Sequence, residues 1–361
     1  IKSILYLLFV LYCFIMYFWF KDYESHLELV NDMSNPHNVL EYIFPMVSIL
    51  DSVFAAQLCL CCAFGGWLNA VMKWWLLEDR PYWWVRETDF YADSHRPVLR
   101  QTHQSCESGP GSPSGHSATA AMMVMLCVLW ASHVFHDRKL VLWWWNYVAW
   151  GLGGAALLAV MIARVYVATH FPHQVVLGSL LGAFLAPALC IYVVDPHVWA
   201  RGQDRTIAQL WYLASTGVTV VIALLTYASL CLCGWDPLWT VKLAFRWCEQ
   251  PANIHPSTTP MFALAHSTGH LLGWALAVTP AVARYRHYTR DRSIIISIIV
   301  TSLQLYMWPL LEQNISKDIA WRFYMTHFFL CAVKPALLLR VTPAISMWPC
   351  KGAGDVKLKM K

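Results

Sequence analysis

Five basic side chains in this sequence stand at or near the ends of apolar runs. They are Lys73, Arg80, His116, Arg164 and His170. A cation in or beside a membrane span is costly unless it is paired, so such residues indicate a functional site. Lysine and arginine bind phosphate oxygens, and histidine can act as a nucleophile or a general acid. No carboxylate cluster accompanies the set, so it predicts phosphoryl transfer without a metal or other cofactor.

The stretch 105–116 is a polar, glycine-rich turn that leads directly into an apolar run. Ser112 is predicted to cap a helix and Pro113 to occupy its first position, where a missing N–H costs nothing. The amides left without intrahelical partners are those of Ser114, Gly115 and His116. They face a space where the helix dipole favours an anion. The alternative is an ordinary capped helix with an incidental histidine.

The other candidates form two pairs. Lys73 and Arg80 are seven residues apart, or two helical turns, and are predicted to share one helix face. Arg164 and His170 are six apart and cannot share a face of one straight helix. Pro172 explains this spacing: Arg164 ends one span, His170 lies in the break, and Pro172 opens the next helix. The alternative for each residue is an ordinary interfacial side chain whose charged end reaches water.

The composition indicates a membrane protein. Hydrophobic residues make up 58% of the chain, charged residues make up 13%, and the mean hydropathy is +0.45. Soluble domains carry roughly 25% charged residues. Several apolar runs reach the length of about 20 residues that spans a bilayer. We therefore expect an all-α, polytopic transmembrane bundle in the lipid bilayer. The net charge of +5 lies mainly in short loops, which favours a role in topology over nucleic-acid binding.

Three regions are predicted along the chain: a hydrophobic signal or anchor segment at 1–25, a membrane-embedded domain at 26–342 and a basic tail at 343–361. The domain is expected to contain nine spans, at 26–50, 53–78, 114–134, 141–163, 172–194, 207–230, 260–282, 293–311 and 322–341.

The loops between these spans differ in charge. Basic turns at 136–139, 201–205 and 284–292 fall on the same side as the tail, which the positive-inside rule makes cytoplasmic. The longer polar loops fall on the far side. Two of their cysteines, Cys106 and Cys248, can pair if that side is oxidising. Asn314 begins a glycosylation sequon on the same side.

The motifs resemble the three-part signature of the type 2 phosphatidic acid phosphatase (PAP2) superfamily. They run from Lys73 to Arg80-Pro81, from Pro113 to His116 and from Arg164 to His170. The stretches 80–85, 106–116, 170–176 and 246–251 are similar to the glucose-6-phosphatase catalytic subunit family within it.

This resemblance implies a PAP2-type core that hydrolyses glucose 6-phosphate to glucose and inorganic phosphate. His170 would form a phosphohistidine and His116 would serve as general acid and base. The residues that hold the phosphoryl group would be Lys73, Arg80, Ser114, Gly115 and Arg164. The family also implies an endoplasmic reticulum membrane protein with a lumenal active site and a cytosolic C-terminus, which can work beside a glucose-6-phosphate transporter. The terminal Lys357 and Lys359 resemble a dilysine retrieval signal for that membrane.

The chain departs from the superfamily pattern at two positions. Ala163 stands where the superfamily has serine, so one hydroxyl to the phosphate is missing. Gln174 stands where it has aspartate, as in glucose-6-phosphatases. We expect Gln174 to meet His170 across one helical turn and fix its tautomer. Two alternatives remain at this point: a lipid phosphate phosphatase of the same superfamily, and a catalytically weak structural or transport-linked protein that keeps the fold.

Overall fold

The computed structural model describes residues 23–92, 95–137, 144–199, 205–278, 282, 293–316 and 318–347. Within these ranges the regular structure is helical, which confirms the predicted all-α class. The apolar segment at 3–20, the terminal Lys357 and Lys359, and most of the basic turns lie outside the described residues.

Seven helical segments in the described part are long and apolar enough to cross a membrane. The helices that carry them are α5 (Ser52–Leu76), α7 (Gly115–Asp137), α8 (Trp145–Tyr166), α9 (Pro172–Leu189), α11 (Arg205–Leu232), α14 (Ile294–Gln313) and α15 (Ala320–Ala336). They correspond to seven of the nine predicted spans. The other two are 26–50 and 260–282, so the count of nine stays a prediction.

The segment predicted as a span at 26–50 is broken into short helices. These are α2 (Tyr23–Ser34), α3 (Pro36–Asn38), the π-helix η1 (Val39–Ile43) and α4 (Phe44–Leu50). Asn35 interrupts the run because its side chain accepts from the His37 amide and Pro36 opens the next helix. Asp51 ends it, since its carboxylate caps α5 by accepting from two amides. The residues that interrupt the apolar run at Asn35 and Pro36 therefore mark a helix break in the structure, and a membrane crossing by this segment stays a prediction.

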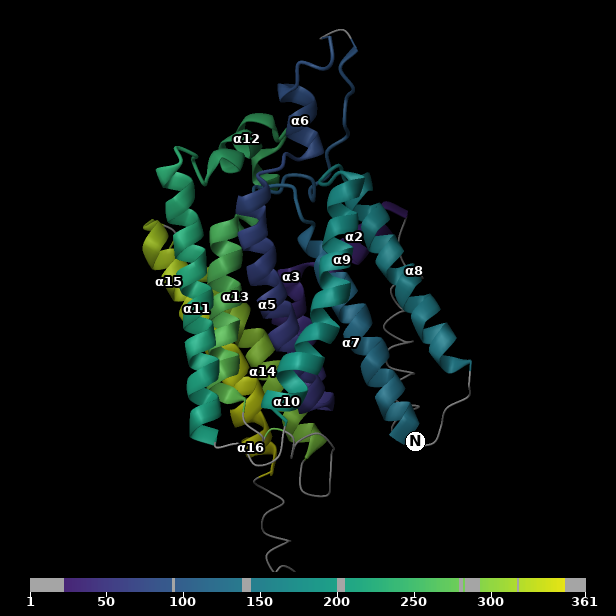
Figure 1. Ribbon diagram of the computed structural model, residues 1–361, viewed down its shortest axis with the longest axis vertical. Coiled ribbons are helices and arrows are strands. Elements are labelled where there is room, and N and C mark those ends of the chain that lie inside the picture. The colour runs from purple at the N-terminus through teal and green to yellow at the C-terminus, as the bar shows by residue number, and fades with distance from the viewer. Residues whose placement is uncertain are drawn as a thin grey trace, which may run out of the picture.

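The remaining elements are short, apart from the buried helix α13 (Pro260–Ala277). They are α6 (Pro81–Glu87), η3 (Cys190–Val194), α10 (Asp195–His197), α12 (Trp239–Trp247), η4 (Pro251–Asn253), η5 (Pro256–Thr258), η7 (Leu337–Val341) and α16 (Thr342–Met347). In Figure 1, α6 and α12 lie at one end of the bundle, and α10 and α16 lie at the other.

Helix α5 forms the centre of the bundle. It packs against α13, α7, α11 and α9, and most of its residues are buried. A second close pair, α7 and α9, brings the predicted cradle next to the break that holds His170. Gly182 permits this approach, because a Cβ there would lie 2.0 Å from the Ala118 carbonyl oxygen. By contrast, α8, α11 and α14 keep most of their apolar surface exposed, as expected for helices that face lipid.

Candidate active site

Four of the five predicted basic residues converge around one side chain, Glu107, which was not among the predicted site residues. Arg80 Nη1 lies 2.8 Å from Glu107 Oε2, and Arg164 Nη2 forms an ion pair with Glu107 Oε1. The two histidines approach the same carboxylate, with His116 Nδ1 at 3.7 Å and His170 Nε2 at 3.9 Å. The predicted gathering of these four residues is therefore present in the structure, with Glu107 at its centre.

The Glu107 carboxylate is a buried anion. Burial alone would raise its pKa, but the guanidinium groups of Arg164 and Arg80 more than offset this and hold the pKa well below its ordinary value. Its two oxygens contact cations that could equally bind phosphoryl oxygens. Arg164 Nε, moreover, is buried without a hydrogen-bond partner among the described residues. The arrangement is an anion site that the protein fills with its own carboxylate.

Arg80 is fixed by several backbone carbonyls of the surrounding loops. Its Nε donates to Gly109 at 2.6 Å, its Nη2 donates to Pro110 at 3.0 Å and its Nη1 donates to Thr169 at 3.2 Å. Lys73 Nζ donates to the same Pro110 carbonyl at 2.5 Å. Both cations are therefore held in place before any ligand arrives, which reduces the reorganisation that binding requires.

Lys73 and Arg80 do not share a helix face as predicted. Helix α5 ends at Leu76, and Leu77 adopts a left-handed conformation with φ of 51°. Arg80 is instead the extended residue before α6, which begins at Pro81. The residue before a proline resists the α region, so the chain leaves the helix before Arg80. The turn, rather than the helical repeat, brings the two side chains to the same carbonyl.

The ring of His170 is oriented by two contacts. Its Nδ1 lies 2.7 Å from the Gly111 carbonyl oxygen, which can only accept, so Nδ1 carries the proton. The lone pair is then on Nε2, which lies 3.3 Å from Arg80 Nη1. Burial and the positive charge of Arg80 hold the pKa of His170 well below its ordinary value. The structure thus presents a neutral imidazole with its lone pair facing the anion site.

The prediction that Gln174 orients His170 directly was wrong. Gln174 Nε2 donates to Glu78 Oε2 and to the Asp79 carbonyl, both at 2.9 Å, while its Oε1 accepts from the Phe171 amide at 3.1 Å. Position 174 is the third residue of α9, from which a side chain reaches back to the helix start. The partner of His170 is Gly111, which must be glycine because a Cβ there would lie 2.3 Å from the Asp79 carbonyl oxygen.

The cradle before α7 also differs from its prediction. The helix begins at Gly115, and the Ser114 hydroxyl accepts from the Ser117 amide at 3.4 Å, so Ser114 occupies the capping position assigned to Ser112. The Ser114 amide donates to the Gln174 carbonyl at 3.1 Å and is not available to an anion. The amides of Gly115 and His116, at the first two helical positions, have no hydrogen-bond partner among the described residues. They remain the candidate backbone donors.

The loop that carries Glu107 is tied to the polar loop before α13. Cys106 and Cys248 form a disulfide with a Cα–Cα distance of 5.8 Å, which confirms that pairing. Next to it, the Ser108 amide donates to the Thr258 hydroxyl at 2.8 Å, and the Tyr82 hydroxyl donates to the Glu107 carbonyl at 2.8 Å. Segments far apart in the sequence therefore fix the position of Glu107.

A cavity adjoins the anion site. Lys73, Glu107, Gly115 and His116 line one part of it, whereas Arg80, Arg164 and His170 do not line it. Glu107 contacts all three of the latter residues and therefore covers them on the cavity side. The rest of the wall is rich in side chains that can donate or accept hydrogen bonds: Asn35, His37, Asn69, Ser257, Thr258, His266 and Ser267. The cavity therefore joins an anion site to a polar wall.

The two remaining predicted positions lie apart from these contacts. Ala163 is fully buried in the last turns of α8. Asn314 is exposed after α14, and its Nδ2 donates to the Leu310 carbonyl at 2.7 Å. Two guanidinium groups, which cannot coordinate a metal, contact the Glu107 carboxylate. Among the described residues, the group whose ligand atoms lie close enough to hold a metal is around Glu41.

Comparisons with known proteins show the family of this chain. A family profile described as the PAP2 superfamily matches residues 54–199. Glucose-6-phosphatase catalytic subunit 1 of Mus musculus is 34% identical over 271 residues, which cover 73% of this chain and 72% of the mouse protein. Glucose-6-phosphatase 2 of Homo sapiens is 30% identical over 345 residues, covering 90% of this chain and 91% of the human protein. Glucose-6-phosphatase catalytic subunit 1 of Haplochromis nubilus is 30% identical over 350 residues, which cover 95% of this chain and 94% of that protein.

No solved structure matches the chain. The profile covers Lys73, Arg80, His116, Arg164 and His170. All of these except Lys73 approach the Glu107 carboxylate. The human relative extends the similarity beyond residue 199, since its alignment covers 90% of this chain. The chain therefore belongs to the glucose-6-phosphatase family, within the PAP2 superfamily.

Proposed function

We propose that this protein hydrolyses glucose 6-phosphate to glucose and inorganic phosphate through a phosphohistidine at His170. One observation carries the mechanism. The lone pair of His170 Nε2 faces a buried anion site in which Arg80 and Arg164 hold a carboxylate. A neutral nucleophile beside fixed cations suits phosphoryl transfer, because cations stabilise the charge on the phosphoryl oxygens in the transition state.

Binding begins with an exchange of anions. The phosphoryl group takes the position of the Glu107 carboxylate between Arg80 and Arg164, and Glu107 moves aside. Lys73 and the free amides at Gly115 and His116 contact the remaining oxygens. The exchange conserves the charge pairing of the buried cations, so neither guanidinium is left unpaired in the free or the bound protein.

Two displacements follow. His170 Nε2 attacks phosphorus, the bond between phosphorus and the sugar O6 breaks, and protonated His116 gives its proton to that oxygen. Glucose leaves. Water then attacks the phosphohistidine, His116 takes the proton of that water, and the P–N bond breaks to release inorganic phosphate and neutral His170. The His116 Nδ1 lies 3.7 Å from Glu107 Oε1, an oxygen that stands in for a phosphoryl oxygen, and this short separation supports the assignment.

The cavity supplies the room for the sugar. Its polar wall, which includes Asn69, Thr258 and Ser267, offers donors and acceptors to the hydroxyl groups of glucose. Such a wall favours a water-soluble sugar over the acyl chains of a lipid phosphate, since burying the polar groups against hydrocarbon would leave them unsatisfied.

We further propose an endoplasmic reticulum location with the active site in the lumen and the C-terminus in the cytosol. The Cys106–Cys248 disulfide supports an oxidising compartment for the site. In this arrangement glucose 6-phosphate must cross the membrane, so a sugar-phosphate transporter is the expected partner. Glycosylation of Asn314 is expected on the same side.

A substrate panel on the purified protein tests the proposal. Glucose 6-phosphate, mannose 6-phosphate and phosphatidic acid are compared by phosphate release at equal concentration. We expect the highest kcat/KM with glucose 6-phosphate, loss of activity in His170→Ala and near-normal activity in the matched control His173→Ala, whose ring contacts the part-exposed Glu78. Preferential hydrolysis of phosphatidic acid would favour the lipid phosphatase alternative, and no hydrolysis of any substrate would favour the inactive one.

A further inference from the structure

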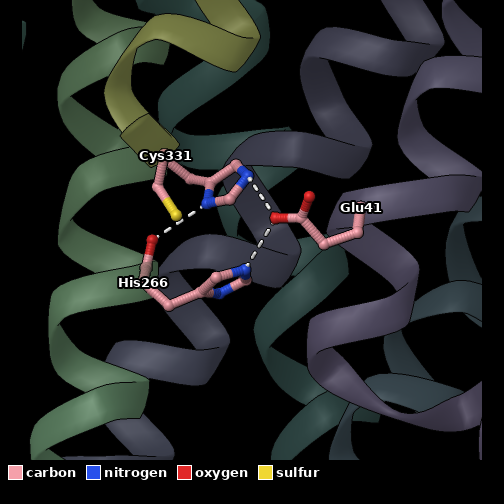
Figure 2. A group of neighbouring side chains, drawn as sticks. Glu41, His266 and Cys331 are labelled. Atoms are coloured by element: carbon pink, nitrogen blue, oxygen red, sulfur yellow. Dashed lines mark hydrogen bonds and ion pairs between the residues drawn. The ribbon is translucent and has the colours of Figure 1, made fainter. Parts of the chain in front are cut away.

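A second buried carboxylate, Glu41, lies at the centre of another cluster. Glu41 belongs to η1, His266 and His270 belong to consecutive turns of α13, and Cys331 belongs to α15. Figure 2 shows the carboxylate of Glu41 facing the His266 ring, with Cys331 on the neighbouring helix. All four residues are more than nine-tenths buried, and one potential ligand atom from each lies within 4.8 Å of the others.

The ring of His270 points an unpaired lone pair into this cluster. Its Nδ1 lies 2.9 Å from the His266 carbonyl oxygen, which can only accept, so Nδ1 carries the proton. The lone pair is therefore on Nε2, which is buried without a hydrogen-bond partner among the described residues and lies 3.8 Å from Glu41 Oε1. Two acceptors thus face each other, an arrangement that a cation between them would stabilise.

We propose that Glu41, His266, His270 and Cys331 bind one zinc ion. Zinc takes four ligands at about 2.0–2.3 Å, so tetrahedral ligand atoms lie about 3.3–3.8 Å apart. His266 Nε2 and His270 Nε2 lie 3.1 and 3.8 Å from Glu41 Oε1. The upper limit of 4.8 Å for the whole set exceeds the tetrahedral value by about 1 Å, which a side-chain adjustment closes.

The groups behind the ligands also fit a metal site. The contact from His270 Nδ1 to a backbone carbonyl is the outer hydrogen bond that usually orients a metal-binding histidine. Lys334 binds Glu41 Oε2, which leaves Oε1 for the metal, and it also donates to Glu312 Oε1 at 2.6 Å. Both carboxylates that surround the site are thereby anchored by one ammonium group.

The charge balance favours a divalent cation. Glu41 and Glu312 contribute two negative charges and Lys334 contributes one positive charge, which leaves a net charge of −1. Zinc binding releases the thiol proton of Cys331 and makes the net charge of the ligand set and its neighbours −2. One Zn²⁺ then neutralises the buried cluster. Two imidazoles, a thiolate and a carboxylate are ligands that suit zinc better than magnesium or calcium, which prefer oxygen alone.

The proposed zinc ligands include none of the residues that are proposed to carry out catalysis. It would join η1, α13 and α15, elements that the sequence separates widely, and all four ligand positions would come from the protein, as in a structural zinc site. His266 also lines the cavity beside the anion site, which provides a path for the ion to enter. The sequence contains one visible part of this set, the His266 and His270 pair four residues apart on one helix face.

Metal analysis of the purified full-length protein tests the proposal. We expect about one zinc ion per chain by inductively coupled plasma mass spectrometry, and loss of that zinc in His270→Ala and in Cys331→Ser. The matched control is Cys59→Ser, which alters another buried free cysteine in α5 and should retain the metal.

Cobalt substitution keeps the test decisive if a variant fails to fold. Wild-type protein loaded with Co²⁺ should show the visible bands of a four-coordinate ion and a near-ultraviolet band from thiolate to cobalt. Cys59→Ser should show both, and folded Cys331→Ser should lose the near-ultraviolet band. Wild-type protein that contains no zinc and gives no cobalt spectrum would overturn the proposal, and the cluster would then be a hydrogen-bonded network that holds a proton. Equal zinc contents in wild-type protein, His270→Ala and Cys331→Ser would also overturn it.

Discussion

Glu107 and Glu41 are buried to nearly the same extent, yet their surroundings differ in kind. Their exposed fractions are 6% and 7%. Both carboxylates have two histidines nearby. Around Glu107 the remaining partners are two guanidinium groups, which donate hydrogen bonds and cannot coordinate a metal. Around Glu41 they are one ammonium group and a thiol, which can become a metal ligand.

The comparison shows that burial alone does not determine what a carboxylate does. At Glu107 the fixed donors remain after the carboxylate moves away, so the site can accept another anion. At Glu41 a lone pair of His270 faces the carboxylate, so the site can accept a cation. Variants at the two clusters test this contrast between an anion site and a cation site.

The largest effect is expected from the proposed nucleophile. His170→Ala should lower kcat for glucose 6-phosphate by roughly 10⁴-fold or more, because no phosphohistidine can form. His270→Ala, at the other cluster, should lower kcat much less, provided that the variant is folded. The measurement is phosphate release by purified protein whose folding has been checked by size-exclusion chromatography. Comparable losses in both variants would contradict the division between the two clusters.

Removal of the proposed proton donor should have the next largest effect. His116→Ala should reduce kcat by about 10²–10⁴-fold, as expected when a general acid is lost. The defect should be smaller with a substrate whose leaving group needs no protonation, such as 4-nitrophenyl phosphate. Rates for the two substrates give the comparison, and an equal loss with both would contradict the general-acid role of His116.

Replacing the internal anion should strengthen the binding of an external one. Glu107→Gln should bind orthovanadate about tenfold more tightly, equivalent to about 1.4 kcal/mol, because vanadate no longer competes with the carboxylate. The same change should lower thermal stability, since two buried guanidinium groups lose their counter-charge. Vanadate inhibition constants and melting temperatures provide the measurements, with Glu41→Gln as the matched control. Unchanged vanadate binding in Glu107→Gln would show that the carboxylate does not occupy the anion site.

The smallest effect concerns pH. The low pKa of Glu107 keeps the carboxylate ionised, so its contribution to stability is complete above the unfolded pKa of about 4.3. The contribution is lost as the pH falls from there through the lower folded pKa. The difference in melting temperature between wild-type protein and Glu107→Gln should therefore stay constant from neutral pH to about pH 5 and shrink in stronger acid. A difference that already disappears near pH 6 would contradict the ion pairs.

Much of the site could be predicted because its charged residues interrupt apolar runs. Arg164 stands out in this way, and Pro172 marks the helix break that places His170. The family motifs then suggested the roles that are proposed for these residues. Glu107 gave no comparable signal, since it lies in a polar loop and its partners Arg80 and Arg164 are 27 and 57 residues away in the sequence. Only the folded chain shows that they meet.

The wrong predictions have local causes. They concern residues at helix ends, where turns and capping hydrogen bonds, rather than the helical repeat, determine where a side chain points. Leu77 redirects the chain before Arg80, and the Ser114 hydroxyl replaces Ser112 as the cap of α7. Gln174 binds the Phe171 amide at the start of its own helix in place of His170. In the second cluster the ligands come from positions 41, 266, 270 and 331, a separation that no local spacing rule detects.

Trapping the covalent intermediate tests the central claim most directly. Purified wild-type protein is mixed with glucose 6-phosphate labelled in the phosphoryl group and quenched within one turnover, and the labelled peptide is identified by mass spectrometry. The account predicts acid-labile, base-stable label on His170, present in the His173→Ala control and absent from His170→Ala. Label on another residue, label that survives His170→Ala, or rapid turnover without any trapped label would contradict catalysis through a phosphohistidine at His170.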